Sequence, residues 1–262
     1  MATAYERVRI ARGAKRPTGI DYLQNVFHGF FELHGDRRYA DDPAIVGGLA
    51  YLGATPVTVI AIEKGHTAKE RVQRGFGAPQ PEGYRKALRL MREAEKFHRP
   101  VVCFVDTSGA GCNVGAEERG QGEAIAECLT TMSALQTPVL SILIGEGGSG
   151  GALALAAGDR VWMLENAVYS VISPEGCATI LWKDAAKAEQ AAEELKLTAD
   201  DALALGVVES VIPEAELGEP EFYDALAQRL MREVDALTEM PIQEVLSARY
   251  ARFRRFGGEA QR

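Results

Sequence analysis

The hydrophobic pattern of the chain alternates between short apolar runs and longer segments with apolar residues at helical spacing. The runs are apolar on both faces, which is typical of buried parallel strands. Strands are predicted at 45–52, 56–63, 101–106, 138–144, 161–164, 168–172 and 207–212. Helices are predicted at 82–98, 117–135, 150–157, and from about 174 and 199. We therefore expect an α/β fold built as a stack of β-β-α units.

The start of the chain is basic and carries no clear apolar period. Residues 1–16 hold five basic side chains against the single acid Glu6. We expect residues 1–18 to form a basic, solvated N-terminal arm, in preference to an arm that binds a partner. The segment from Gly19 is patterned again, and a helix ending near Gly35 is predicted from apolar residues at helical spacing: Leu23, Val26, Phe27, Phe30 and Phe31.

The rest of the chain shows no internal repeat and no low-complexity linker. Two C-terminal helices are predicted from about residue 220, separated near Pro241. A single domain over 19–262 with helical ends is the simplest organisation, because single hydrophobic cores extend to about 250 to 300 residues.

Composition and charge restrict the class of protein. The chain has 262 residues, 47% hydrophobic and 25% charged, as globular proteins do. Its formal net charge of −8 disfavours nucleic acid or an anionic membrane as the main partner. Four cysteines without a Cys-x-x-Cys pair are expected to be small buried residues in a reducing compartment. With no signal peptide pattern and no apolar run near 18 residues, we expect a cytoplasmic protein.

The densest glycine segment, 145–152, follows a predicted strand and leads into a helix. So many glycines indicate a sharp turn or a close backbone approach, and free amides at a helix start favour a phosphate or an oxyanion. A second turn, at 108–115, follows the preceding strand, and the two turns should lie on the same side of the sheet. The predicted donors are the backbone amides of Gly147, Gly148, Gly150 and Gly151, with Gly109 and Ala110 as the opposing turn.

Three short motifs overlap the glycine segment, and each is disfavoured. Gly145-x-Gly147-x-x-Gly150 fits a dinucleotide fingerprint, but Gly158 ends the following helix after about two turns, which is short for a Rossmann helix. Ser149 stands in a Gly-x-Ser-x-Gly elbow, but all four histidines precede it, which is the wrong order for an α/β-hydrolase. A Walker A motif would need a Gly-Lys-Ser or Gly-Lys-Thr ending that this segment lacks.

Longer blocks of sequence resemble one family. Gly-Ala-Glu-Glu-Arg-Gly-Gln at 115–121, the glycine segment extended to 154, and Tyr-Ser-Val-Ile-Ser-Pro-Glu-Gly-Cys-Ala at 169–178 are similar to carboxyltransferase alpha subunits of bacterial multi-subunit acetyl-CoA carboxylases. Flanking stretches at 32–37, 45–48 and 81–91 agree, and the resemblance runs from about Gly19 to Pro213.

The resemblance implies a crotonase-like (ClpP/crotonase) fold and half of an active site. The implied reaction transfers the carboxyl group of carboxybiotin, borne by a biotin carboxyl carrier protein, to acetyl-CoA, and forms malonyl-CoA for fatty acid biosynthesis. A beta subunit would complete the site in a probable alpha2-beta2 assembly, with biotin carboxylase in the larger complex. Carboxybiotin would lie beside Gly150, Gly151 and Ala152. No metal is expected here, because the zinc ribbon of this family belongs to its beta subunits.

Some assignments stay open at the level of the sequence. Lys64 and Arg71 belong to a basic cluster that either meets CoA or the carrier protein, or is a solvated loop. Residues 108–113 read Ser-Gly-Ala-Gly-Cys-Asn where the family often has Pro-Gly-Ala-Tyr-Pro-Gly, so the turn loses an aromatic wall and the rigidity of its prolines. The alternatives are a carboxyltransferase for another short acyl-CoA, a non-catalytic scaffold, and a crotonase-like hydratase, although the glycine loops carry only Glu146 as an acid.

Overall fold

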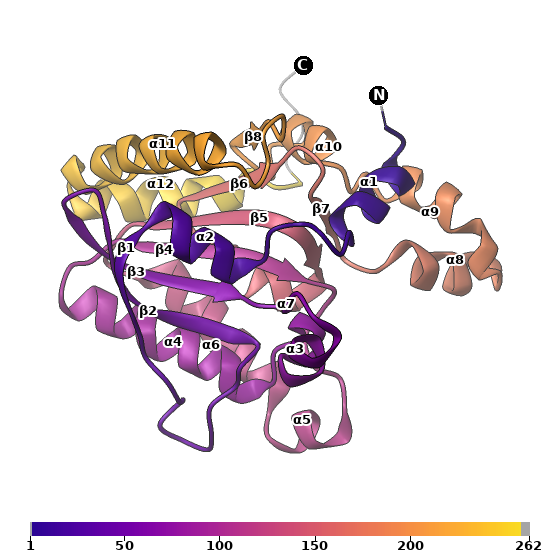
Figure 1. The fold of residues 1–262 in the computed structure, drawn as a ribbon, viewed down its shortest axis with the longest axis horizontal. Coiled ribbons are helices and arrows are strands. Elements are labelled where there is room, and N and C mark those ends of the chain that lie inside the picture. The colour runs from indigo at the N-terminus through magenta and orange to yellow at the C-terminus, as the bar shows by residue number, and fades with distance from the viewer. Residues whose placement is uncertain (1, 258–262) are drawn as a thin grey trace.

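The computed structural model describes residues 2–257, and its centre is one mixed sheet (Figure 1). The eight strands are β1 (His28–Glu32), β2 (Ile45–Leu52), β3 (Thr55–Ile62), β4 (Val101–Thr107), β5 (Val139–Gly148), β6 (Arg160–Leu164), β7 (Val168–Ser170) and β8 (Ser210–Ile212). Their order is β1-β2-β3-β4-β5-β6-β8, and β7 pairs with the end of β5. Strands β1 to β3 are antiparallel neighbours, and β3 to β8 pair in parallel. The α/β prediction is confirmed.

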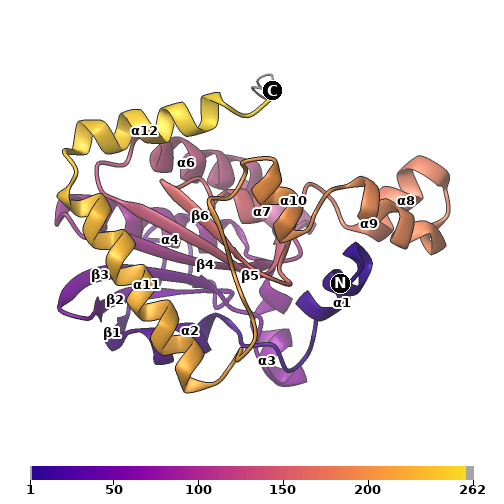
Figure 2. The same ribbon diagram turned by 90° about the horizontal axis from the view of Figure 1, so that it is seen from above.

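Helices cover both faces of the sheet. They are α1 (Ala4–Ala11), α2 (Gly19–Val26), α3 (Ala68–Gln73), α4 (Pro81–Lys96), α5 (Val114–Glu118), α6 (Gln121–Ala134), α7 (Ser149–Leu153), α8 (Pro174–Trp182), α9 (Ala188–Glu194), α10 (Ala199–Ala204), α11 (Pro220–Glu239) and α12 (Ile242–Arg254), with short 3-10 turns at Gly75–Gly77 and Ala185–Lys187. Figure 1 shows α4 and α6 below the sheet and α2 and α11 above it, while α1, α8 and α9 lie together beside it. Figure 2 shows the same lateral position of α8 and α9 from above.

The core follows from the apolar strands. All seven residues of β4 are buried, and successive side chains face opposite layers. Phe104 stacks on Tyr22 of α2 with ring centroids 5.1 Å apart, and Tyr22 packs edge-on against Phe222 and Tyr223 of α11. The strands at 45–52 and 56–63, which form the antiparallel pair β2 and β3, the helix near 82–98 and the C-terminal helix pair were predicted correctly. No helix within residues 2–257 combines the length and apolar character needed to cross a membrane.

The prediction of a solvated N-terminal arm is wrong. Residues 4–11 form α1, which begins at Thr3 with a capping box to Glu6. Arg7 and Arg16 are buried, and both arginines bind acids that are distant in the sequence: Arg7 pairs with Asp200, and Arg16 pairs with Glu214. A cluster of basic residues predicts side chains exposed to solvent only when no carboxylate from a distant part of the chain pairs with them.

Two predicted boundaries and one prediction of burial also need correction. The helix expected to reach Gly35 ends at Val26, and the segment with Phe30 and Phe31 forms the edge strand β1. The helix expected over 117–135 is divided at Gly120, whose left-handed φ of 79° ends α5 before α6 begins. The expectation that the cysteines are buried fails at Cys112, which is exposed in the turn after β4.

Candidate active site

Two glycine turns meet at one edge of the sheet because the strands before them are parallel neighbours. The register of β4 and β5 runs from Val101 opposite Val139 to Thr107 opposite Gly147. The turn at 108–113 follows β4, and α7 follows β5. Their carboxyl ends therefore deliver both turns to the same place, as α/β sheets do at binding sites.

The backbones of the two turns are in contact, which is why glycine stands at two positions of the segment 145–152. A Cβ atom built on Gly148 would lie 2.7 Å from the amide nitrogen of Gly109. A Cβ atom on Gly151 would lie 2.5 Å from the amide nitrogen of Ala110 and 2.8 Å from the Tyr84 hydroxyl. Gly150 differs, because its Cβ would meet only Ile125, at 3.8 Å. The structure thus places the two predicted turns against each other.

The six predicted donors are in different hydrogen-bonding states. Gly147 lies in β5 opposite Thr107 of β4 and Tyr169 of β7, and Gly148 lies opposite Ser170 of β7, so both glycines take part in strand pairing. The amide of Gly109 donates to Thr107 Oγ1 at 3.0 Å. The amides of Gly150 and Gly151 stand in the first turn of α7, where no intrahelical acceptor exists. Within residues 2–257 no other acceptor is found for them, nor for the amide of Ala110.

Unpaired amides that lie close together can bind a negatively charged oxygen. Ala152, predicted to lie beside carboxybiotin, is completely buried, so neither its side chain nor its backbone is exposed in this chain alone. Beside Gly150 an open, mostly apolar hollow of about 320 Å³ is lined by Leu153, Tyr169 and Val171 among others. The site therefore combines polar backbone donors with an adjoining apolar wall.

Hydrogen bonds fix the turn at 108–113, which lacks the prolines that the family often has there. The Thr107 hydroxyl donates to the carbonyl of Gly109 at 2.8 Å and accepts from its amide. Gly109 has a φ of 148°, a conformation that side chains rarely adopt. At the far side of the turn, the Gly111 amide donates to Pro79 O at 2.9 Å, and Gln121 Nε2 donates to the Gly111 carbonyl at 2.8 Å.

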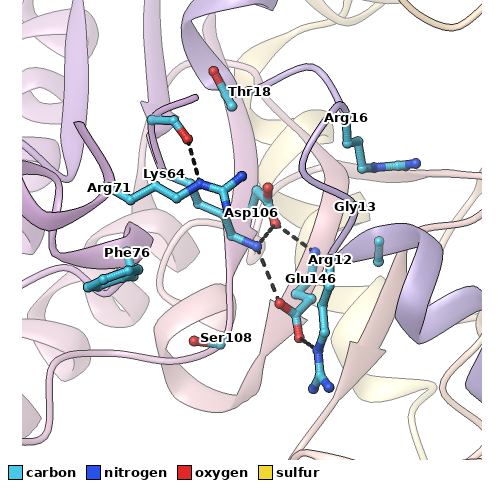
Figure 3. A pocket seen from close by; sticks show the side chains of 12 residues that line it. Arg12, Gly13, Arg16, Thr18, Lys64, Arg71, Phe76, Asp106, Ser108 and Glu146 are labelled. Carbon is cyan, nitrogen blue, oxygen red and sulfur yellow. Dashed lines mark hydrogen bonds and ion pairs between the residues drawn. The ribbon is translucent and has the colours of Figure 1, made fainter. Parts of the chain in front are cut away.

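A charged cavity of about 220 Å³ lies on the other side of the turns, between α1 and α3 (Figure 3). Lys64 points into it and contacts two acids, with Nζ 2.6 Å from Asp106 Oδ1 and 3.3 Å from Glu146 Oε2. Burial alone would lower the pKa of Lys64, but the two carboxylates outweigh it and raise the pKa. Lys64 is therefore not part of a solvated loop.

Three arginines, Arg12, Arg16 and Arg71, also line this cavity. Arg71 uses Nε to bind the carbonyl of Gly65 at 3.1 Å, and its guanidinium borders the cavity (Figure 3). Arg12 Nε lies 2.8 Å from Glu146 Oε1, and the same guanidinium binds Glu175 at 2.7 Å. Among residues 2–257 no group of three or more His, Cys, Asp or Glu side chains is placed to hold a metal ion.

Two residues at the site have backbone conformations that side chains rarely adopt. Ser149 adopts a left-handed φ of 50°, and Phe76, which borders the charged cavity, has a φ of 56°. Bulky residues in this region are unusual and cluster at functional sites. The Gly-x-Ser-x-Gly pattern marks position 149, but nothing in the sequence around Phe76 indicates its conformation.

The sequence matches known proteins over nearly its whole length. The family described as acetyl co-enzyme A carboxylase carboxyltransferase-like matches residues 1–257. The acetyl-coenzyme A carboxylase carboxyl transferase subunit alpha of Ruminiclostridium cellulolyticum is 57% identical over 255 residues, 97% of this chain and 98% of that protein. The carboxyl transferase subunits beta/alpha protein of Natranaerobius thermophilus is 52% identical over 259 residues, 97% of this chain and 43% of that protein.

Solved structures show the same fold at low sequence identity. A Pseudomonas malonate decarboxylase hetero-tetramer in complex with coenzyme A superposes with a TM-score of 0.72 at 18% identity, covering 91% of this chain and 98% of that chain. Transcarboxylase 12S gives a TM-score of 0.68 at 19% identity, covering 84% of this chain and 42% of that chain. The crotonase-like fold expected from the sequence is confirmed. The chain belongs to the family of acetyl-CoA carboxylase carboxyltransferase alpha subunits.

Proposed function

We propose that this chain, together with a beta subunit, transfers the carboxyl group of carboxybiotin on a biotin carboxyl carrier protein to acetyl-CoA and forms malonyl-CoA. The observation that carries the proposal is the contact between two glycine turns, some of whose amides are unpaired within residues 2–257, in a chain that matches the family over residues 1–257. Fatty acid biosynthesis in the cytoplasm is the setting that this reaction implies. Biotin carboxylase would recharge the carrier.

The residues of the site fit an anionic oxygen of the ligand. Carboxybiotin supplies an activated carboxyl group, and negative charge develops on its ureido oxygen as that group leaves. The amides of Gly150, Gly151 and Ala110 are the donors that this chain offers to such an oxygen, because they are unpaired and already held in place. The other predicted donors, at Gly147, Gly148 and Gly109, support the turns through ladder pairing or the Thr107 hydroxyl.

The acids near the site do not favour a hydratase. A hydratase of this fold would need carboxylates free to act as acid and base at a thioester. Glu146 is bound by Lys64 and Arg12, and Asp106 is bound by Lys64. Both carboxylates are thus engaged in ion pairs. A scaffold role is less favoured, since it would not need unpaired amides.

A beta subunit is the partner that the comparisons favour. The relative from Natranaerobius is named for both subunits, beta before alpha, which would place its beta part close to the start of the alpha part. The start of this chain lies in α1, beside α8 and α9 (Figures 1 and 2). The outer face of α8 exposes Ile180 and Leu181, and Val171 is 74% exposed in the segment before it. We expect the beta subunit to cover these residues in an alpha2-beta2 assembly.

The test mixes the purified chain with a cognate beta subunit and measures carboxylation of free biocytin from malonyl-CoA. Activity is expected from the pair and from neither chain alone. No activity from the pair, or activity from this chain alone, would contradict the proposal. Replacing acetyl-CoA by propionyl-CoA in the forward direction decides between the acetyl acceptor and another short acyl-CoA.

The docking face is tested by co-purification with the beta subunit. The double variant Ile180→Glu, Leu181→Glu should lose the partner while the isolated chain stays folded, because buried charges at an interface centre are costly. Phe97→Glu is the matched control, since Phe97 is also exposed, at 55%, but follows α4 at the opposite end of β4. Equal loss of the partner in both variants would refute this assignment.

A further inference from the structure

Lys64 joins the ends of the two strands that carry the glycine turns. It lies two residues after the end of β3, and its Nζ contacts Asp106, near the end of β4, and Glu146, near the end of β5 (Figure 3). Asp106 precedes Ser108 by two residues, and Glu146 precedes Gly148 by two. One ammonium group therefore sits immediately before both turns.

The acids bound by Lys64 also hold the two backbones together. Asp106 Oδ1 accepts a hydrogen bond of 2.7 Å from the amide of Glu146, so its carboxylate lies on the backbone of β5. A Cβ atom on Gly145 would lie 2.7 Å from Asp106 Oδ2, and glycine at this position is what admits the carboxylate. The spacing of β4 and β5 at this point thus depends on the position of the Asp106 carboxylate.

Without Lys64 this arrangement would be electrostatically unfavourable. The side chains of Asp106 and Glu146 are only 6% and 12% exposed, and two carboxylates in one buried place repel each other. Arg12 binds Glu146 from the other side. Among residues 2–257 Lys64 is the only cation in an ion pair with Asp106.

We propose that Lys64 is a positioning residue for carboxyl transfer: it neutralises Asp106 and Glu146 and so holds the two glycine turns at the separation that aims their amides at one point. This inference rests on the proposed function and gives Lys64 a role other than contact with CoA or the carrier. Lys64 acts through the strand ends and does not touch the ligand.

The experiment compares Lys64→Met with Lys64→Arg in the complex with the beta subunit. The methionine keeps the length of the side chain and removes its charge. We expect kcat for biocytin carboxylation to fall by about 100-fold with KM unchanged, the cost of misplacing catalytic groups by about 1 Å. Arginine should restore most of the rate. Unchanged kcat, or a higher KM for CoA or biocytin alone, would overturn the proposal.

The control is a buried ion pair at the opposite end of the same strand. Arg249 binds Asp159 at 2.8 Å, and Asp159 in turn accepts from the amide of Val139, the first residue of β5. Arg249→Met should lower the thermal stability and leave kcat of the folded complex unchanged. If it lowers kcat as Lys64→Met does, general destabilisation is the cause and the proposal fails.

Hydrogen exchange tests the positioning without any activity. In the isolated full chain, Lys64→Met should raise amide exchange at 107–111 and 148–152 and leave the start of β5 unchanged. An unchanged exchange pattern would overturn the proposal. Should Lys64→Met not fold, Asp106→Asn serves instead, because it removes the carboxylate that Lys64 binds and that lies on the backbone of β5; it should raise exchange in the same two segments. Hydrogen exchange therefore tests the role of Lys64 alone. The proposed function is tested separately, by the activity of the unmodified chain with the beta subunit.

Discussion

Gly151→Ala should disable carboxyl transfer, and Gly150→Ala should not. The two positions are neighbours in α7, and neither has a positive φ. They differ in what an added Cβ atom meets: the amide nitrogen of Ala110 at 2.5 Å for Gly151, against Ile125 at 3.8 Å for Gly150. The pair therefore separates the loss of a glycine from the loss of contact between the turns.

The magnitude follows from the size of the clash. Nonbonded heavy atoms settle about 3.5 Å apart, so the backbone at Ala110 must retreat by about 1 Å to accept a methyl group on Gly151. A displacement of that size costs roughly 100-fold in rate, and complete loss of one oxyanion donor costs about 100- to 1000-fold. We expect kcat of Gly151→Ala to fall within this range. Overpacking should also cost about 1 to 3 kcal/mol of stability.

Gly150→Ala should raise the stability of the chain, whereas Gly151→Ala should lower it. Alanine in place of glycine in a helix gains up to about 1 kcal/mol, and nothing near Gly150 opposes the methyl group. Its kcat should be that of the unmodified chain. If the methyl group touches the ligand, the effect will appear in KM.

The assay is biocytin carboxylation by the complex with the beta subunit, with urea unfolding of each variant as the measure of stability. Equal kcat values for Gly150→Ala and Gly151→Ala would refute the reasoning. A second check uses Tyr84, whose buried hydroxyl has no partner among the described residues and would lie 2.8 Å from the new Cβ atom. If Tyr84→Phe restores the rate of Gly151→Ala, the clash that matters is with the tyrosine and not with the turn.

Three further predictions follow from the charges and thiols. Cys112 is the exposed cysteine, so native alkylation followed by mass measurement should modify it first, and the three buried thiols should react only after unfolding. Arg16→Met should lower the free energy of unfolding in urea by about 3 to 5 kcal/mol, because it leaves Glu214 buried without its partner. Burial would raise the pKa of Asp41, but hydrogen bonds, first from Lys86, lower it to about 2. Asp41 therefore contributes to the free energy of unfolding above its unfolded pKa near 4, and this contribution is lost as the pH falls toward 2. The free energy of unfolding of Asp41→Asn, measured against pH, should fall less steeply than that of the unmodified chain over this range.

The strands of the core could be predicted because their pattern is local. Each residue of β4 is buried on both faces, and a run of apolar residues encodes that directly. The edge strand β1 was mistaken for a helix because Phe30 and Phe31 continue the helical spacing of α2 by coincidence. The strand β1 has only five residues and none of them is fully buried, so its sequence lacks the alternation of apolar and polar residues that marks a half-buried strand.

The contacts of the charged residues could not be predicted, because their partners are distant in the chain. Arg16 meets Glu214, and Lys64 meets Asp106 and Glu146, only after the sheet has formed. A short stretch of sequence shows only that basic residues are clustered, which predicts that they are exposed to solvent. A charged side chain is buried only when a specific opposite charge pairs with it. The glycine turns were found because a close backbone approach leaves a mark in the sequence itself. Whether an individual amide is unpaired depends on strand pairing, and the sequence carries no signal of it.

The unusual turn at 108–113 shows why a site made of backbone tolerates changes of sequence. Its rigidity was expected to fall without prolines, yet the Thr107 hydroxyl bonds both the amide and the carbonyl of Gly109, and Gln121 and Pro79 fix Gly111. These bonds restrict the same backbone that a proline ring would restrict. The groups offered to the ligand are amides, which every residue except proline supplies. Side chains at this turn can therefore vary as long as Gly109 keeps its φ and positions 148 and 151 stay free of a Cβ atom.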